Sequence, residues 1–179
     1  MHGLGALINL PDFSPDDDIS IEVIEHEAPV TNRSFARRIA LQVLYEVDTT
    51  THDPADVIDG RLESQNTDKK EARYVRLLVE GVLAKREAID TVIRKYVLEW
   101  PLEQIATVDR NILRMAVLEF AVEQKAPVSV VIDEAVGLAR IFSAESSIGF
   151  INGVLGKLAM DEDSMQQLRA LKRDQEQDL

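Results

Sequence analysis

The stretch DKKEARYVRLLVEGVLAKREAIDTVIRKY (residues 68–96) decides the fold class of this chain. Apolar residues recur in it at steps of three and four over roughly eight helical turns, the spacing that places them on one face of an α-helix. The members of this face are Tyr74, Leu77, Leu78, Gly81, Val82, Ile89, Val92, Ile93 and Tyr96. The pattern predicts one long helix that buries a single apolar stripe.

Shorter helices are predicted before this stretch. Thr31 and Asn32 can cap a first turn, and an apolar stripe follows over residues 36–47 at the same three- and four-residue steps. Pro54 suits the start of a further helix over residues 55–62, because the fixed φ of proline matches the first helical position.

After the long helix, Pro101 precedes a single predicted turn at 102–105. Asp109 is the predicted cap of the next helix, and Ser146 or Ser147 the predicted cap of the last one. Gly149, Gly153 and Gly156 lie within that last helix near one face. Because glycine weakens a helix interior, we expect them to allow another backbone to pack closely.

The segment Val128–Ile132 is open to two interpretations. Its β-branched run fits a short strand, but apolar residues continue from it at helical spacing as far as Phe142. A lone strand would also lack a pairing partner, so a helix capped by Ser129 is preferred. The whole pattern predicts an all-α fold.

The composition excludes several classes of site. The 179 residues include no cysteine, which excludes disulfides, iron–sulfur clusters and cysteine nucleophiles. The three histidines are scattered, so no histidine-rich metal site is expected. No nucleophile elbow, phosphate loop, zinc-protease motif or calcium loop is present. We therefore expect a protein that is not an enzyme and that has no cofactor and no metal.

Charge divides the chain into three parts. The net charge is −12, and residues 1–31 carry seven acids without a lysine or arginine, which predicts a disordered acidic extension. Residues 32–160 are nearly neutral and form the predicted helical domain, and residues 161–179 form a charged C-terminal tail. No segment approaches the ~18 apolar residues of a membrane span. We expect a cytoplasmic protein with no membrane contact.

Arg33, Arg37 and Arg38 form a cluster in the first predicted helix, with no acid before Glu46. The cluster fits a solvated helix face or a set of internal ion-pair partners. It also fits a face that bridges successive phosphates of a nucleic acid. Aromatic residues that could stack on unpaired bases, although each also fits a core position, are Tyr74, Tyr96 and Phe150.

Four motifs then occur in a fixed order: NRSFARRIALQVLY (32–45), DRNILR (109–114), PVSVVIDEAV (127–136) and FINGVL (150–155). Together they resemble the NusB family of bacterial transcription antitermination factors, over about residues 33–159. The resemblance implies an all-helical fold of two small subdomains, one over 33–96 and one over 101–159.

The resemblance also implies a function. Family members bind the boxA element of ribosomal RNA operon leader transcripts together with NusE, the ribosomal small-subunit protein that doubles as an antitermination factor. The complex is delivered to RNA polymerase with other Nus factors. Such a protein would support processive transcription of ribosomal RNA genes.

Site residues follow from matching these motifs. The candidate RNA contacts are Arg33, Arg37, Arg38, Tyr96 and Phe150. Tyr45 matches a tyrosine at the NusE interface, and Asp109 matches an acidic position where the RNA and NusE surfaces meet.

Two other functions stay open at this stage. Similar helical domains form the amino-terminal part of ribosomal RNA cytosine methyltransferases, but that function needs a cofactor-binding domain downstream. The chain also fits a protein-interaction module that keeps the NusE surface without RNA binding.

Overall fold

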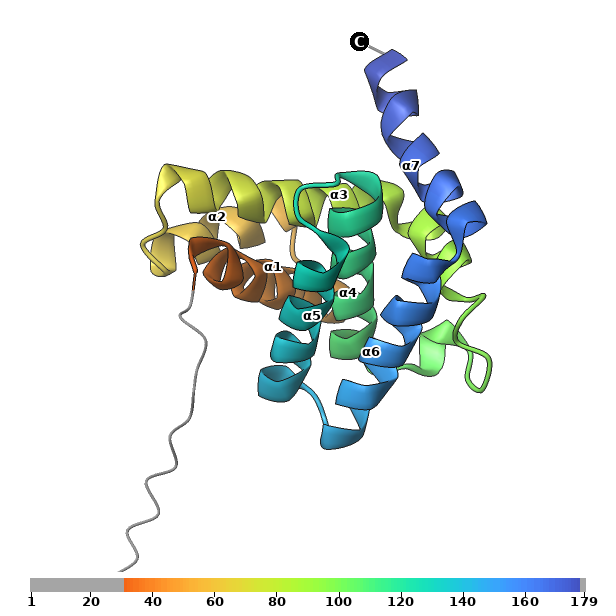
Figure 1. Ribbon diagram of the computed structural model, residues 1–179. Coiled ribbons are helices and arrows are strands. Elements are labelled where there is room, and N and C mark those ends of the chain that lie inside the picture. Colours follow the sequence, from red (N-terminus) through yellow and green to blue (C-terminus); the bar gives the residue numbers. More distant parts are fainter. Residues whose placement is uncertain (1–30, 178–179) are drawn as a thin grey trace, which may run out of the picture.

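The computed structural model describes residues 31–177 and consists of helices joined by short connections (Figure 1). The elements are α1 (Asn32–Thr49), α2 (Pro54–Ser64), α3 (Lys69–Ile93), the 3₁₀ turn η1 (Leu102–Gln104), α4 (Thr107–Val117), the π-helical turn η2 (Leu118–Val122), α5 (Val128–Phe142), α6 (Glu145–Met160) and α7 (Glu162–Gln177). Residues 31–177 contain no strand, which confirms the all-α prediction and the helical interpretation of Val128–Ile132. The predicted acidic extension lies outside the described residues, apart from Thr31.

The first three helices begin where local sequence predicts. The Thr31 hydroxyl accepts a hydrogen bond from the backbone N–H of Ser34 at 3.1 Å, which caps α1. Asp53 caps α2, directly before Pro54. Asp68 and Glu71 form a reciprocal capping box at the start of α3.

The predicted caps of the later helices are wrong. Helix α4 begins after Ala106, α5 begins after Pro127 rather than at Ser129, and α6 begins after Ala144. None of these three starts has a side-chain cap. The side chains of Asp109 in α4 and Ser147 in α6 form a hydrogen bond with each other instead. This contact between helices engages the side chains that were predicted to cap the helix starts.

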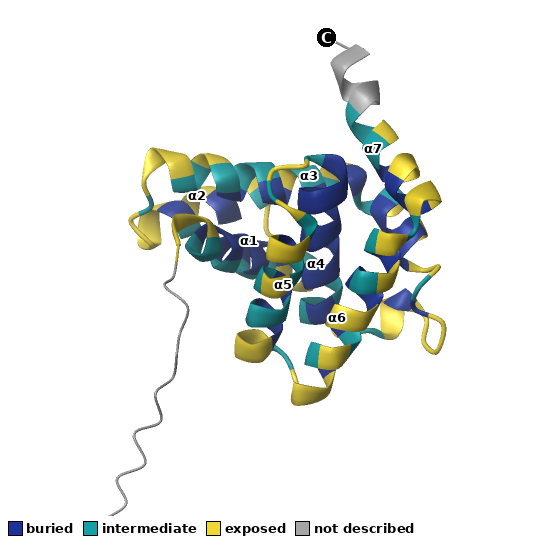
Figure 2. Cartoon of the chain, viewed as in Figure 1, coloured by how far each residue is buried: buried dark blue, intermediate teal, exposed yellow. Residues whose placement is uncertain are grey.

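Helix α4 forms the centre of the molecule. It contacts α1, α3, α5 and α6, and every residue from Asn111 to Val122 is buried. Figure 2 shows this segment in dark blue, with exposed residues gathered on the elements around it. Helix α4 therefore joins α1 and α3 to α5 and α6 through one continuous core.

The remaining helices lie on two sides of α4. Helices α1 and α3 pack against each other on one side, with α2 beside them, and α5 packs against α6 on the other (Figure 1). The boundary that the family resemblance implies, at 96–101, falls in the connection between α3 and η1.

The predicted close packing at the glycines of α6 is wrong. A Cβ atom built at Gly149, Gly153 or Gly156 meets nothing within 4 Å. The close approach occurs instead at Gly81 of α3, where a Cβ would lie 2.7 Å from Leu118 Cδ2. Gly81 therefore allows α3 to pack against the central segment.

Part of the predicted charged tail is a packed helix. Helix α7 contacts η2, α3 and α6, and it buries Met165 and Leu168. This helix was not predicted from the apolar pattern of the sequence. Among residues 31–177, no helix is long and apolar enough to cross a membrane.

Candidate functional site

Arg33 is exposed at the start of α1 and held in a defined position. Its Nη1 donates a hydrogen bond to the backbone carbonyl of Lys125 at 3.0 Å. Its guanidinium carbon lies 5.1 Å from the centre of the Tyr74 ring, within the range of a cation–π interaction. Residues from α1, α3 and the α4–α5 connection therefore fix a cation that faces solvent.

Arg37 lies one turn further along α1 but is buried, with 4% of its side chain exposed. Its Nε donates to Glu119 Oε2 at 2.9 Å, and its Nη2 donates to the other oxygen of that carboxylate. A second carboxylate, Glu134 of α5, lies 3.3 Å from Nη1. Helical spacing predicts that Arg33 and Arg37 share one face that could bridge phosphates. In the structure they do not, because Arg33 is exposed and Arg37 is buried.

The charges around Arg37 shift the acid–base properties of the buried cluster. Burial alone would lower the pKa of Arg37, but the hydrogen bond and charge of Glu119 outweigh it and raise that pKa. Tyr74 donates its hydroxyl hydrogen to Glu119. Burial is the largest cause that raises the pKa of Tyr74, and the Glu119 carboxylate raises it further. The cluster is a fixed ion pair that supports the Tyr74 ring beneath Arg33.

Arg38 has a third environment. It is half-buried on α1 and forms no ion pair among the described residues. Of the three arginines, only Arg33 and Arg38 therefore retain a charge that no carboxylate of residues 31–177 neutralises.

Tyr96 and Phe150 lie at the edge of the core. Both are half-buried and pack against it, Tyr96 after the end of α3 and Phe150 on α6. The Tyr96 hydroxyl donates to Asp161 and lies 2.7 Å from Ser164 Oγ. Burial, followed by the hydrogen bond to Asp161, raises the pKa of Tyr96. Tyr96 thus ties the end of α3 to the junction of α6 and α7.

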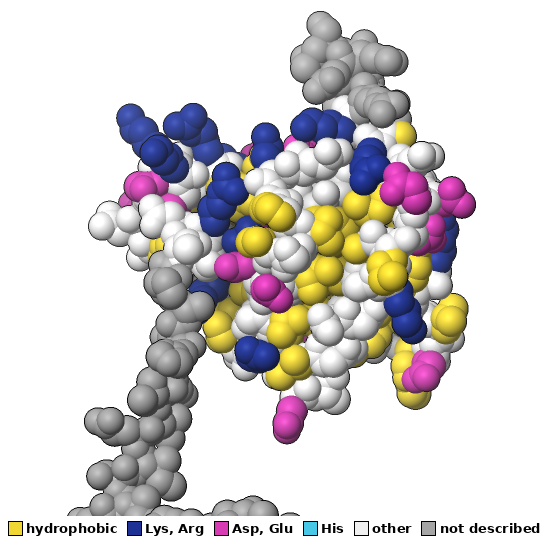
Figure 3. Space-filling model, viewed as in Figure 1, with side chains coloured by type: hydrophobic (Ala, Val, Ile, Leu, Met, Phe, Trp, Pro, Cys, Tyr) yellow, Lys and Arg dark blue, Asp and Glu magenta, His cyan; other side chains and the backbone are white. Residues whose placement is uncertain are grey.

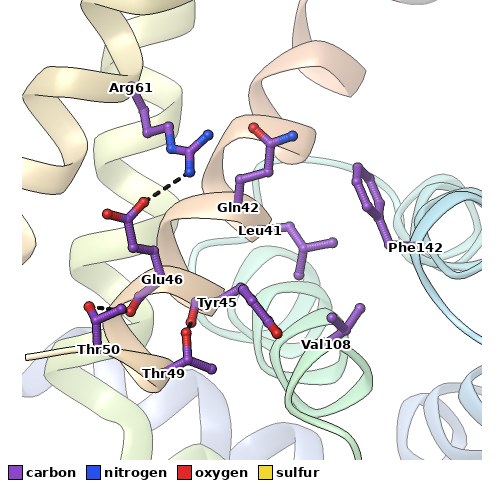
Figure 4. A pocket seen from close by; sticks show the side chains of 9 residues that line it. All are labelled: Leu41, Gln42, Tyr45, Glu46, Thr49, Thr50, Arg61, Val108 and Phe142. Atoms are coloured by element: carbon purple, nitrogen blue, oxygen red, sulfur yellow. Dashed lines mark hydrogen bonds and ion pairs between the residues drawn. The ribbon is translucent and has the colours of Figure 1, made fainter.

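Tyr45 lines an open pocket of about 650 Å³ between α1, α2, α4 and α5 (Figure 4). Tyr45 is 46% exposed and is one of the large apolar residues at the surface of the described chain. Leu41, Val108 and Phe142 supply the apolar wall of the pocket, and Phe142 faces Leu41 and Val108 from α5.

The other side of this pocket is polar. Glu46 accepts a hydrogen bond from Arg61 at 2.9 Å and lies 2.9 Å from His52 Nδ1. The hydrogen bond to His52, followed by that to Arg61, lowers the pKa of Glu46. An exposed tyrosine between an apolar wall and a charged rim is typical of a protein-binding surface.

Asp109, which the family resemblance places where the RNA and NusE surfaces meet, is buried. Its Oδ2 accepts a hydrogen bond from Ser147 Oγ at 2.6 Å, and its Oδ1 is buried without a hydrogen-bond partner among the described residues. The contact ties the first turn of α4, beside Val108, to the first turn of α6.

Glu119 and Glu134 were not predicted to be partners of Arg37. For Glu119 a signal was available: it is the single acid within the apolar run Leu118–Val122, where a buried carboxylate needs a partner. Among the described residues, no group of three His, Asp or Glu side chains could hold a metal ion.

Comparison with known proteins identifies the family. The NusB family model matches residues 34–160. The transcription antitermination protein NusB of Desulforamulus reducens is 40% identical over 131 residues, which cover 73% of this chain and 92% of that protein. NusB of Dehalococcoides mccartyi strain 195 is 38% identical over 129 residues, covering 72% of this chain and 90% of that one.

Solved structures agree with the sequence matches. T. maritima NusB superimposes with a TM-score of 0.68 at 28% identity, over 76% of this chain and 98% of that chain. A chain from a crystal structure of NusB and NusE in complex with double-stranded RNA gives 0.64 at 29% identity, over 70% and 94%. This chain belongs to the NusB family.

Proposed function

We propose that this chain is a transcription antitermination factor that binds boxA RNA of ribosomal RNA operon leader transcripts together with NusE. The observation that carries the proposal is its family membership over residues 34–160, joined to its likeness to a NusB solved with NusE and RNA. The function is one of binding rather than catalysis, in the cytoplasm. Other Nus factors and RNA polymerase join through the assembled complex, which supports processive transcription of ribosomal RNA genes.

The NusE surface in this proposal is the pocket around Tyr45. The half-exposed ring, the apolar wall and the polar rim support this assignment. Tyrosines that become buried when two proteins bind carry much of the affinity of protein interfaces. Asp109 acts indirectly, since its bond to Ser147 fixes the first turns of α4 and α6 beside the pocket.

The RNA surface in this proposal begins at Arg33 and includes Arg38, Tyr96 and Phe150. Arg37 has a changed role. A direct contact with RNA would break its ion pairs with Glu119 and Glu134 and leave the buried Glu119 carboxylate unpaired, at a cost that one phosphate contact does not recover. Arg37 therefore acts by positioning Tyr74 and, through it, Arg33.

One observation favours a second candidate. Burial of Arg37 removes one of three arginines from the surface, which favours a protein-interaction module that binds NusE without RNA.

Fluorescence anisotropy with labelled single-stranded boxA RNA, with and without NusE, separates the two candidates. The antitermination function predicts binding to boxA RNA that NusE strengthens; the protein module predicts NusE binding alone. The Tyr45→Ala variant should weaken the NusE contact by about 10- to 30-fold, the loss of a typical interface hot spot.

The Arg33→Ala variant is the matched change on the other surface. It should weaken RNA binding and leave the affinity for NusE alone unchanged. If Arg33→Ala weakens NusE binding while Tyr45→Ala does not, the two surfaces have been assigned the wrong way round.

A further inference from the structure

A second groove lies where α1 begins beside the first turns of α3. It has a volume of about 520 Å³. Its lining residues are Asn32, Arg33, Lys70, Glu71, Arg73, Tyr74 and Leu77. We call it the α1–α3 groove. The motifs that indicated the family include Arg33 but none of the lining residues on α3.

The three cations of the groove are not neutralised. Arg33, Lys70 and Arg73 form no ion pair among the described residues. Arg33 and Arg73 each donate to a backbone carbonyl, at 3.0 and 3.3 Å, which leaves most of the five N–H donors of each guanidinium available.

The single carboxylate of the groove is already engaged. Glu71 Oε2 accepts a hydrogen bond from the backbone N–H of Asp68 at 2.9 Å, as part of the capping box of α3. The lining thus carries three cations against one acid that is held by the helix start. Figure 3 shows lysine and arginine side chains gathered over this end of the molecule, around the turn between α2 and α3.

Three other arginines of the same two helices are paired. Arg76 and Arg86 of α3 form ion pairs with Asp59 and Asp48, and Arg37 of α1 pairs with Glu119. Arg33, Lys70 and Arg73 differ from these three arginines, because they are unpaired among the described residues and line the same groove. A protein of net charge −12 offers many carboxylates, so this local excess of positive charge favours an anionic ligand.

We propose that the α1–α3 groove binds the sugar–phosphate backbone of RNA, with Lys70 and Arg73 each contacting a phosphate beyond the one at Arg33. This inference rests on the proposed function, because it extends the same RNA surface from α1 onto α3. Tyr74 and Leu77 also line the groove and supply apolar surface against which a ribose can pack. Arg33 is fixed over Tyr74 before RNA arrives, so little side-chain entropy is lost on binding.

The test is the Lys70→Ala/Arg73→Ala variant of the full chain, measured by fluorescence anisotropy against boxA RNA and a scrambled RNA of equal length, with NusE at saturation. Loss of two phosphate contacts should reduce the slope of log affinity against log salt by about 1.4 for a single strand. The same relation gives about 25-fold weaker binding at 0.1 M salt. BoxA and scrambled RNA should lose equally, because phosphate contacts carry no sequence information.

Two matched variants control for charge and folding. Arg140→Ala/Arg169→Ala removes two cations from α5 and α7 with the same change in net charge, and should leave the salt slope almost unchanged. Lys70→Arg/Arg73→Lys keeps both charges and should restore most of the affinity. Lys70 and Arg73 are exposed, so thermal melting of all variants should match the parent protein.

The outcomes separate the two proposals. If the parent protein binds boxA RNA but Lys70→Ala/Arg73→Ala keeps its affinity and slope, the groove proposal is overturned and the function stands. If that variant loses NusE binding instead, the groove is a protein surface and the proposal is again overturned. If the parent protein does not bind boxA RNA, both proposals fall.

Discussion

Arg37 and Glu119, 82 residues apart in sequence, form a buried ion pair that Glu134 and Tyr74 complete. A buried pair contributes little net stability against an apolar alternative, but removal of one partner leaves a charge without compensation. The same residues hold the ring that Arg33 covers. At the scale of single residues, one cluster thus links stability to the candidate RNA surface.

Glu119→Gln should therefore destabilise the protein strongly. The change leaves the Arg37 guanidinium buried beside a neutral amide, and we expect the free energy of unfolding to fall by about 3 kcal/mol. Urea denaturation followed by circular dichroism measures it. Glu134→Gln is the control: that carboxylate is 27% exposed, and its loss should cost less than about 1 kcal/mol. Equal losses in the two variants would contradict the central role of Glu119.

The hydrogen bond of Tyr96 to Asp161, beyond the C-terminal end of α3, should make stability depend on pH. This hydrogen bond is the largest of the effects that lower the pKa of Asp161. A lowered carboxyl pKa contributes stability that is complete above the ordinary aspartate value, about 3.9, and is lost as pH falls through the lower folded value. Tyr96→Phe should remove this contribution at neutral pH. The variant should then unfold at lower urea at pH 7 but lose less stability than the parent between pH 5 and pH 2. Parallel curves for the two proteins would refute the hydrogen bond's contribution.

At the scale of elements, the packing between helices depends on Gly81 rather than on the glycines of α6. Leu118 is buried in η2 and lies where a Gly81 side chain would project. The contact joins the longest helix to the central segment. Gly153, in contrast, faces open space.

Gly81→Leu should overpack this contact and reduce the free energy of unfolding by about 1–3 kcal/mol. Gly153→Leu introduces the same side chain where nothing lies within 4 Å. Because leucine favours a helix over glycine, this variant should be neutral or up to about 1 kcal/mol more stable. Thermal and urea denaturation of both proteins measure the contrast, and an equal loss at the two positions would contradict the packing described here.

At the scale of the whole molecule, the acidic residues before Thr31 are tethered directly to the helix that carries Arg33. Residues 1–31 hold seven acids and no base. A tethered anionic segment has a high effective concentration near its attachment point, so even weak contacts become populated. We predict that these residues compete with RNA for the cations near Arg33.

Removal of residues 1–30 should therefore raise the affinity for boxA RNA. Exposed ion pairs contribute at most about 1 kcal/mol each, so we expect a modest increase of about two- to fivefold. Salt weakens both the internal contacts and the RNA contacts, so both proteins must be compared at one moderate ionic strength. Equal affinities would leave the acidic segment without a competitive role.

Local sequence determined where the first three helices of this protein form. Apolar periodicity, the capping residues Thr31 and Asp68, and Pro54 act within a few residues of each other, so they predicted α1, α2 and α3 correctly without knowledge of the fold. The ordered motifs likewise indicated the family. Periodicity identifies a helix and its apolar face because both depend on neighbours in sequence.

Only the tertiary structure decided which polar residues are available at the surface. Arg33 and Arg37 are equivalent by helical spacing, yet only Arg37 is buried and paired with Glu119 and Glu134. No local pattern indicates a partner 82 residues away. Asp109 bonds to Ser147 instead of capping a helix for the same reason. The glycines of α6 looked suited to close packing, but the neighbouring helix lies elsewhere. Burial and ion pairing depend on which segments meet in space, and that is set by the packing of the whole chain.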